Sequence, residues 1–346
     1  MLLRIVVLFS LLFTSILYGK ELPTFSGTNQ YYLPFKSRSM VDDFFIRAKA
    51  LNLTVVRTWA FCEASNQGGL CFQPAPYTYD EAAFIQLDYV VAKAKEQGIQ
   101  LILTLVDNWP SYGGIPQYVK WYGLNDHDDF YRDSKVKDTY KAYVSHVLNR
   151  TNTLTNITYK NEPTILALEL GNELRSNDLP ALYAWTDEMA HFIKGIDTQH
   201  LLTTGSEGSE YSDSYEMHKS DAIDFVSFHL YPENWGWGVD EQRTVNYIRD
   251  QAAVARRLGK PLFLGEFGLL DKNKRRDFFQ KIYQTALEEK VNGVAFWLLS
   301  GRQADGTLYP DYDGFTVYYP ESQDVIDVIQ GFSKDVNTKR FKQSRL

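Results

Sequence analysis

This 346-residue sequence is poor in several features that would point to particular classes of protein. It has only two cysteines and neither a His-x-x-His nor a Cys-x-x-Cys spacing, so no metal site is expected. Lysine and arginine are dispersed along the chain and the formal net charge is -7, which argues against the basic surface of a nucleic-acid-binding protein. We therefore expect no nucleic-acid partner.

Long hydrophobic runs are also scarce. The longest lies near the N-terminus, from Ile5 to Leu17, and no stretch reaches the ~20 apolar residues that a membrane-spanning helix needs. Arg4 precedes this run and Lys20 follows it, a pattern typical of a secretory signal peptide. We predict a signal peptide over residues 1–19 and a mature chain over 20–346, secreted to the medium or the periplasm and free of the membrane. The alternative is an uncleaved anchor, because no clean Ala-x-Ala site precedes the expected cut.

The two cysteines, Cys62 and Cys71, lie close together in a Gly-bearing segment. In an exported chain such a pair is expected to form one disulfide bond. A short bridge of this kind stabilises a protein by about 2 to 3 kcal/mol. No Pro-, Ser- or Gly-rich linker divides the rest of the mature chain, so we expect one domain.

Apolar runs alternate with amphipathic stretches along the mature chain. The runs predict eight strands, at 25–29, 53–59, 100–106, 165–170, 201–204, 225–228, 262–264 and 293–298. The amphipathic stretches predict helices at 41–51, 81–97, 134–149, 180–196, 241–258, 274–290 and 323–332. Strands that are apolar on both faces and separated by helices favour a parallel sheet buried between helices. Eight such units predict an α/β fold, a closed (β/α)8 TIM barrel. An open doubly wound sheet is the alternative, but no Gly-x-Gly-x-x-Gly follows the first strand.

Polar residues follow these strands, which is unusual for runs that are otherwise apolar. The segment "LELGNELRS", for example, finishes its apolar run with Asn172 and Glu173. In a barrel the carboxyl ends of all strands open onto one mouth, where the active site lies. The residues expected there are Arg57, Trp59, Asp107, Asn108, Asn172, Glu173, His229, Tyr231, Glu266 and Trp297.

Two of these residues, Glu173 and Glu266, would face each other across the mouth. A pair of carboxyl groups is what glycoside hydrolysis requires, one to protonate the leaving oxygen and one to attack or to activate water. We expect Arg57 and a tyrosine hydroxyl to hold Glu266 ionised and Glu173 to keep its proton. Trp297 would offer a flat floor to a sugar ring. Each residue alone also has a structural explanation, so the prediction rests on their joint position.

The strand-end segments also resemble a known family. "GTNQYYL", "NLTVVRTWAF", "ILTLVDNWPSYGGIPQYVKW", "ALELGNELR", "FVSFHLYPENW", "LFLGEFG" and "VAFWLLSG" are similar, in order, to motifs of glycoside hydrolase family 5, and most closely of its endo-β-1,4-mannanases. The resemblance runs from about Phe25 to Phe332.

The resemblance implies a retaining mechanism with Glu173 as acid/base and Glu266 as nucleophile. It further implies substrate-binding or orienting roles for Arg57, Trp59, Asn108, Asn172, Arg175, His229, Tyr231 and Trp297, with His229 lining the cleft and Arg175 toward the leaving group. No cofactor is implied, since carboxylates carry out this chemistry alone. Leu174 departs from the family's usual proline and Asp107 from its more frequent asparagine, which affects the detail of sugar binding and not the reacting groups.

The predicted function is thus internal cleavage of a β-mannan, glucomannan or galactomannan by a monomeric enzyme. A cellulase or another β-glycanase is the first alternative, because the two kinds of substrate differ mainly in the orientation of one hydroxyl. A non-catalytic carbohydrate-binding protein is a more distant alternative, because such proteins typically lose one carboxylate and this sequence has both.

Overall fold

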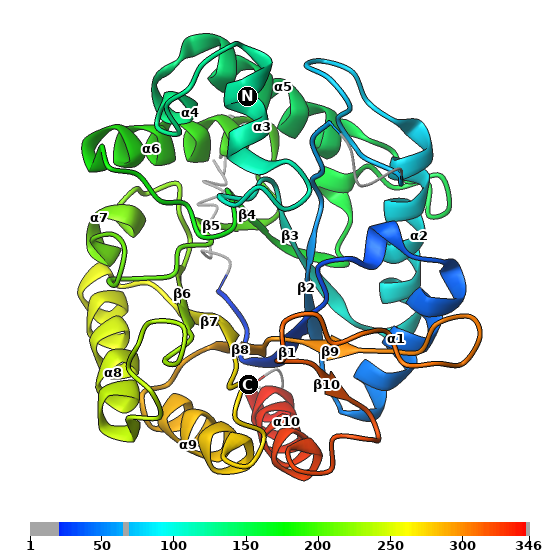
Figure 1. Cartoon of the computed structure of the whole chain (residues 1–346), viewed down its shortest axis with the longest axis vertical. Coiled ribbons are helices and arrows are strands. Elements are labelled where there is room, and N and C mark those ends of the chain that lie inside the picture. The colour runs from blue at the N-terminus through cyan, green and yellow to red at the C-terminus, as the bar shows by residue number, and fades with distance from the viewer. Residues whose placement is uncertain (1–20, 65–68, 344–346) are drawn as a thin grey trace, which may run out of the picture.

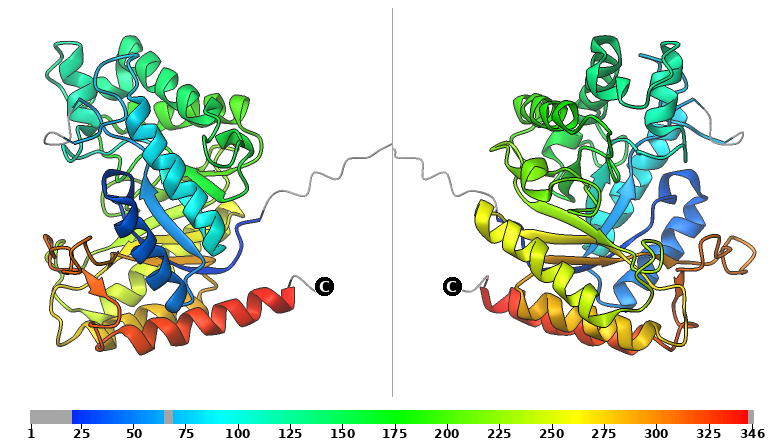
Figure 2. Two further views of the ribbon diagram at one scale, coloured as in Figure 1. Left: turned by 90° about the vertical axis from the view of Figure 1, so that its right-hand side faces the viewer. Right: turned by 60° about the vertical axis from the view of Figure 1, so that its left-hand side comes forward.

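A computed structural model describes residues 21–64 and 69–343. The predicted signal peptide at 1–19 lies outside the described residues. Figure 1 looks into a ring of strands surrounded by helices, and Figure 2 shows the same molecule from two other sides. In the described part of the chain, no helix is long and apolar enough to cross a membrane.

Eight parallel strands form the central sheet, in the order β5-β4-β3-β2-β1-β8-β7-β6. They are β1 (Phe25–Asn29), β2 (Val55–Trp59), β3 (Gln100–Thr104), β4 (Ile165–Glu169), β5 (Leu201–Thr203), β6 (Val226–Leu230), β7 (Leu262–Phe267) and β8 (Gly293–Phe296). Between the outermost strands, the Asp224 amide donates to the Leu202 carbonyl at 2.8 Å and the His229 amide donates to the Glu207 carbonyl at 3.1 Å. These bonds nearly close the sheet, and the predicted TIM barrel is confirmed.

Helices cover the outside of the barrel (Figure 1). The long ones are α1 (Arg38–Ala50), α2 (Glu81–Gln97), α5 (Ser134–Asn149), α6 (Leu179–Ile196), α8 (Glu241–Leu258), α9 (Arg275–Glu288) and α10 (Ile326–Gln343). The predicted bounds of α2, α5 and α8 agree at both ends. Two of these helices are followed by Gly98 and Gly259 in the left-handed conformation that glycine favours at a helix end.

Several short elements were not predicted. They are α3 (Gly114–Trp121), α4 (Asp129–Arg132), α7 (Ser214–His218), the 3-10 helices η1 (Leu33–Phe35) and η2 (Tyr159–Asn161), and the two-residue strands β9 (Leu299–Ser300) and β10 (Val317–Tyr318). Elements this short contain too few turns or pleats to show a period in the sequence.

Some strand ends differ from the prediction. β7 continues to Phe267 and β6 to Leu230, so Glu266 and His229 lie within strands that pair with each other and not after them. The polar side chains of Glu266 and His229 interrupt the apolar run in the sequence, although the strand pairing continues through both residues. β8 stops at Phe296, because Leu299 and the residue after it pair instead with β10. α10 extends past the predicted end at Phe332, since Val336 is still buried.

The barrel interior is apolar at the amino ends of the strands. One layer there takes a side chain from each strand or its first flank: Phe25, Val55, Ile102, Ala167, Leu201, Phe225, Phe263 and Ala295, with Leu22 beside them. This layer closes one end of the barrel to water and leaves polar side chains to gather at the other end.

The predicted disulfide bond between Cys62 and Cys71 is present. It lies in the connection that follows β2. The side chain of Glu63, the residue after Cys62, accepts a hydrogen bond from the Gly114 amide at 2.8 Å. The Glu63 amide donates to the Tyr112 carbonyl at 2.7 Å. The bridged segment is thereby tied to the connection after β3, which carries part of the site.

Candidate active site

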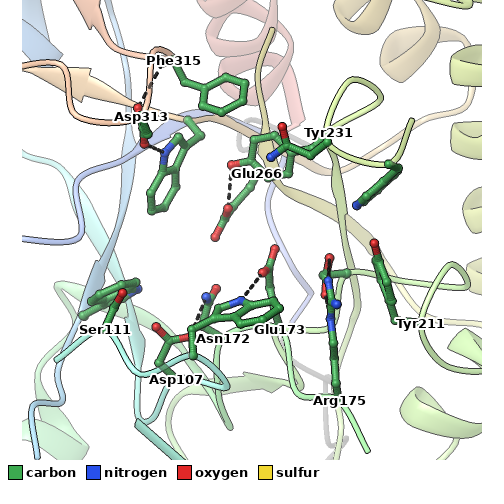
Figure 3. A pocket seen from close by; sticks show the side chains of 16 residues that line it. Asp107, Ser111, Asn172, Glu173, Arg175, Tyr211, Tyr231, Glu266, Asp313 and Phe315 are labelled. Atoms are coloured by element: carbon green, nitrogen blue, oxygen red, sulfur yellow. Dashed lines mark hydrogen bonds and ion pairs between the residues drawn. The ribbon is translucent and has the colours of Figure 1, made fainter. Parts of the chain in front are cut away.

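A cavity of about 520 Å³ opens at the carboxyl ends of the strands (Figure 3). It is lined by Trp59, Asp107, Trp109, Ser111, Asn172, Glu173, Arg175, Glu207, Tyr211, Tyr231, Asn234, Trp235, Glu266, Trp297, Asp313 and Phe315. These residues come from connections that are far apart in sequence, as expected at the mouth of a barrel.

Glu173 and Glu266 point toward each other across this cavity (Figure 3). One carboxylate oxygen of each and one ring nitrogen of His229 all lie within 4.8 Å of one another. The two glutamates that the sequence assigned to the fourth and seventh strands therefore meet at one opening. Such a gap is close to the ~5 to 5.5 Å of glycosidases that form a covalent intermediate, and well below the ~6.5 to 9.5 Å that leaves room for an attacking water.

Arg57, in the middle of β2, orders this region. Its fully buried guanidinium donates to Glu266 Oε1 at 2.5 Å, Asn172 Oδ1 at 2.8 Å, Glu169 Oε2 at 2.6 Å and Asn29 Oδ1 at 3.1 Å. A planar group with five N–H donors suits several acceptors in fixed directions. Arg57 thus fixes the carboxylate of Glu266 and the amide of Asn172 relative to each other.

The second oxygen of Glu266 accepts a hydrogen bond from the Tyr231 hydroxyl at 2.7 Å. Both contacts expected for Glu266, to Arg57 and to a tyrosine, are therefore present. Burial nevertheless raises the pKa of Glu266 above its usual value, against the opposing charges of His229 and Arg57.

Glu173 lies just past β4 with a φ of 54°, in the left-handed region that a glutamate rarely adopts. Its carboxylate accepts a hydrogen bond from Trp109 Nε1 at 2.8 Å and lies 2.8 Å from His229 Nδ1. Its amide donates to the Gly205 carbonyl at 2.9 Å. Backbone strain of about 1 to 2 kcal/mol at such a residue is held by surrounding contacts and is common at active sites.

The expected order of ionisation is wrong for the free protein. Burial would raise the pKa of Glu173, but the hydrogen bond and the charge of His229, helped by Trp109 and Arg175, outweigh it and lower that pKa. Burial lowers the pKa of His229, yet the nearby charge of Glu266 and the bond to Glu173 raise it overall. Sequence reasoning treated His229 only as a cleft residue and therefore overlooked the partner that favours the charged form of Glu173.

Arg175 lies on one side of the carboxylate pair with Tyr211 (Figure 3). It forms a two-pronged ion pair with Glu207, at 2.6 and 2.9 Å, and its guanidinium lies 3.4 Å from the centre of the Tyr211 ring and 4.6 Å from that of Trp109. Burial and the charge of Glu173 raise the pKa of Glu207 to about 7 in spite of this ion pair.

Trp59 and Trp297 line the cavity together, as expected. The Trp297 ring is parallel to that of Tyr31, with ring centres 5.3 Å apart, and its Nε1 donates to Asp313 Oδ2 at 2.7 Å. Tyr31 also packs against Trp59, at 4.8 Å. The two tryptophans are therefore held in fixed orientations by neighbouring aromatic rings.

Three of the predicted binding residues, Arg57, His229 and Asn108, are not among the residues that line the cavity. His229 is fully buried behind the carboxylates, where it contacts Glu173 and not the open cleft. Asn108 is also buried, and its side chain accepts from the Arg175 amide at 3.0 Å. It lines a smaller neighbouring cavity instead. His229 and Asn108 thus contact the cavity residues Glu173 and Arg175 by hydrogen bonds and do not face the opening themselves.

Sequence reasoning did not select Glu207, Tyr211, Asp313 or Phe315. Glu207 could have been found, because it follows β5 as Glu173 follows β4. Asp313 and Phe315 lie in the long connection after β8, where no strand end marks them, and only the fold brings them to the cleft.

The three donor groups of Glu173, His229 and Glu266 are of types that also bind divalent cations. Here Arg57 lies 2.5 Å from Glu266 and supplies a fixed positive charge beside the same carboxylates. The arrangement therefore suits proton transfer and nucleophilic attack better than it suits a cation.

Comparisons with known proteins agree with this geometry. A family model described as GH family 5 beta-mannosidase-like matches residues 45–309. A protein of Oryza sativa subsp. japonica named mannan endo-1,4-beta-mannosidase 4 is 35% identical over 361 residues, covering 90% of this chain and 77% of that protein. Mannan endo-1,4-beta-mannosidase 3 of Arabidopsis thaliana is 38% identical over 281 residues, covering 70% of this chain and 67% of that protein.

Solved structures give the same result. An endo-beta-1,4-mannanase from Thermotoga petrophila superposes with a TM-score of 0.84 at 34% identity, covering 93% of this chain and 78% of that one. An endo-1,4-beta-mannanase from Rhizomucor miehei gives a TM-score of 0.85 at 32% identity, covering 91% and 95%. Since the family model, the relatives and the paired glutamates agree, the chain belongs to glycoside hydrolase family 5 and is a glycoside hydrolase.

Proposed function

We propose that this enzyme is an endo-β-1,4-mannanase that cleaves internal bonds of β-mannan, glucomannan and galactomannan with retention of configuration. The observation that carries the proposal is the gap of less than 4.8 Å between carboxylate oxygens of Glu173 and Glu266. The names of the two relatives from Oryza sativa and Arabidopsis thaliana, both mannan endo-1,4-beta-mannosidases, support the substrate class.

In the first step, Glu266 attacks the anomeric carbon while the bond from that carbon to the leaving oxygen breaks. Glu173 donates a proton to the leaving oxygen. In the second step, Glu173 takes a proton from a water molecule, which attacks the same carbon and releases Glu266. Two inversions at one carbon give net retention.

The proton for the first step is available beside Glu173. His229 has a raised pKa and lies 2.8 Å away along a hydrogen bond, so a proton shift across this bond leaves a neutral imidazole and a protonated Glu173. A sugar in the cleft would exclude water and favour this shift, because the neutral forms need less solvation.

Asn172 is suited to hold the sugar hydroxyl next to the reacting carbon. A side-chain amide has two N–H donors, and Asp107 accepts from only one of them, at 3.0 Å. The other remains for the substrate, while Arg57 keeps the amide oriented. Contacts to this hydroxyl strengthen in the transition state.

We further propose that the enzyme is exported after loss of residues 1–19 and acts as a monomer. The N-terminal apolar run and the disulfide bond between Cys62 and Cys71 support export, because disulfides persist in oxidising compartments.

Substrate identity is tested by reducing-sugar release from locust bean gum and from carboxymethyl cellulose. We expect release from the mannan only. Preferential release from the cellulose derivative would make the enzyme an endo-β-1,4-glucanase, the nearest alternative on this scaffold.

The roles of the two glutamates are tested by substitution and azide rescue. Glu266→Ala should abolish hydrolysis with the fold intact, and Glu173→Ala should lower the rate on mannan by about 10²- to 10⁴-fold, the range for lost acid/base catalysis. With an activated aryl β-mannoside, azide should give the α-azide with Glu266→Ala and the β-azide with Glu173→Ala. Near-wild-type sugar release by Glu266→Ala would refute the assignment.

A further inference from the structure

Tyrosines gather on one rim of the cleft, beyond the residues that reach the reacting carbon. Tyr31 and Tyr112 flank Trp59, with ring centres 4.8 and 5.5 Å from it. From Tyr31 the contacts continue outward through Tyr32, at 4.9 Å, to Tyr309, a further 4.5 Å away. An aromatic path thus leads from the cavity wall to the outer surface of the barrel mouth.

Tyr312 ends this path and is 73% exposed, a large apolar surface for a single side chain to leave in water. Its ring centre lies 5.6 Å from that of Tyr309. Burial raises the pKa of the Tyr31 and Tyr112 hydroxyls, and the nearby phenols of Tyr309 and Tyr312 raise both further. The rings of Tyr31 and Tyr112 also lie 6.2 Å apart, so these tyrosines belong to one aromatic cluster.

The segment that carries these two outer tyrosines is firmly held. Asp311 Oδ1 accepts from the amides of Gly314 and Thr316 at 2.9 and 3.2 Å, and the buried Arg275 donates to the carbonyls of the same two residues at 2.9 and 3.1 Å. Asp313, next to Tyr312, bonds Trp297 in the cleft. Tyr312 is thus presented in a defined position relative to the cavity.

The cluster lies on the side of the cleft away from the leaving group. Glu173, the proton donor, contacts Trp109 and is flanked by Arg175, whereas Asp313 lies on the opposite side of the cavity (Figure 3). A β-1,4-linked chain that spans the carboxylate pair would therefore run its nonreducing part toward Trp297 and the tyrosines.

We propose that Tyr309 and Tyr312, at the outer end of the aromatic cluster that contains Tyr31 and Tyr112, form an outer binding site for one more sugar residue on the nonreducing side of the substrate chain. The Tyr312 ring offers a face for the C–H side of a pyranose. Lys36, whose ammonium lies 4.5 Å from the centre of the Tyr309 ring, adds a donor for sugar hydroxyls. This site rests on the proposed mannanase function and extends it to chain-length preference.

The test compares kcat/KM on mannohexaose and mannotetraose for the wild type, Tyr312→Ala, Tyr312→Phe and Tyr77→Ala. Tyr77 is a matched control, an exposed tyrosine (55%) that does not line the described cleft. We expect Tyr312→Ala to lower the hexaose-to-tetraose ratio by about three- to tenfold, the effect of one lost aromatic contact. Tyr312→Phe should keep most of the ratio, and Tyr77→Ala should keep all of it.

Cleavage of reducing-end-labelled mannopentaose gives a second measurement. Loss of a site on the nonreducing side should let the chain bind further toward the other side, so the labelled product becomes longer in Tyr312→Ala. An unchanged ratio, an equal loss at both lengths, or a shorter labelled product would overturn the outer site. Failure of the wild type to cleave either oligosaccharide would instead overturn the proposed function, and this site with it.

Discussion

Single residues at the mouth illustrate how burial and charge compete. Glu266 has a cation and a hydroxyl at hydrogen-bonding distance, yet its pKa is raised. The loss of hydration on burial destabilises the charged carboxylate by more than these two contacts stabilise it. The same contacts still fix the orientation of its carboxylate. Their value therefore lies in position and in stabilising charge during the reaction.

The Tyr231 hydroxyl is one contact that can be removed cleanly. Tyr231→Phe should lower kcat by about 10- to 100-fold, because a hydrogen bond to a charged group contributes about 1.5 to 3 kcal/mol. The aromatic ring at position 231 should stay packed against Phe315, so the melting temperature should change little. Rates on locust bean gum and thermal unfolding measure the two effects. An unchanged kcat would mean that the hydroxyl does not act on the nucleophile.

Glu207 gives a pH dependence of stability. Its carboxyl has a pKa of about 7 when folded, against a usual 4.5, so the folded protein binds more protons between these pH values. The stabilisation of the folded state by protonated Glu207 is therefore fully present below about pH 4.5. It is lost as pH rises through 7, and the loss is about 3 kcal/mol at most.

Urea unfolding between pH 4 and 8 tests this for the wild type and Glu207→Gln. The variant lacks the titrating group, so the stability difference between the two proteins should shift in favour of the variant as pH rises across this window. A difference that stays constant with pH would contradict the raised pKa.

At the scale of elements, β4 and β5 approach so closely at their carboxyl ends that a side chain does not fit between them. Gly205 has a φ of 73°, and a Cβ added there would lie 1.9 Å from the Gly171 carbonyl oxygen. Its own carbonyl accepts the Glu173 amide. This glycine therefore sets the position of Glu173, the proposed acid/base.

Gly205→Ala should lower both stability, by more than about 2 kcal/mol, and kcat, because the strand ends must separate to admit a methyl group. Gly98→Ala is the matched control: φ is 69°, and nothing lies within 4 Å of the added Cβ. Gly98→Ala should lower the free energy of unfolding only by the ~1 kcal/mol that alanine loses in a left-handed conformation, and it should leave kcat unchanged. Equal effects of the two substitutions on unfolding and turnover would show that the close approach has no role.

Across the described part of the molecule, hydrogen bonds link the eight barrel strands into one sheet, and the last helix packs against the first strand. α10 packs beside β1, and Ser333 Oγ donates to Ser26 Oγ at 2.8 Å. Among the described residues, the two large hydrophobic clusters both take side chains from strands all around the barrel, so no group of strands has a core of its own.

We therefore expect one cooperative thermal transition for residues 20–346. Calorimetry, tryptophan fluorescence and far-UV circular dichroism should give coincident midpoints. Two resolved transitions would contradict the prediction of a single domain.

The elements that could be predicted are those with a long or repeated signal. α2, α5 and α8 have enough turns for the helical period to fix both ends, and the eight apolar runs define the barrel. The strand ends then located Glu173, Glu266, Arg57 and Tyr231. α7 and the outer tyrosine segment have no such signal, because their positions depend on what they pack against.

The sequence by itself determined the fold class and the two glutamates that meet at the barrel mouth, because hydrophobic period and strand-end position are local properties of the chain. Only the tertiary structure decided the partners: that His229 bonds Glu173, that Glu207 bonds Arg175, and that Tyr312 packs against Tyr309. Charges and rings act over a few ångströms in space, and residues far apart in sequence reach that range only when the barrel closes.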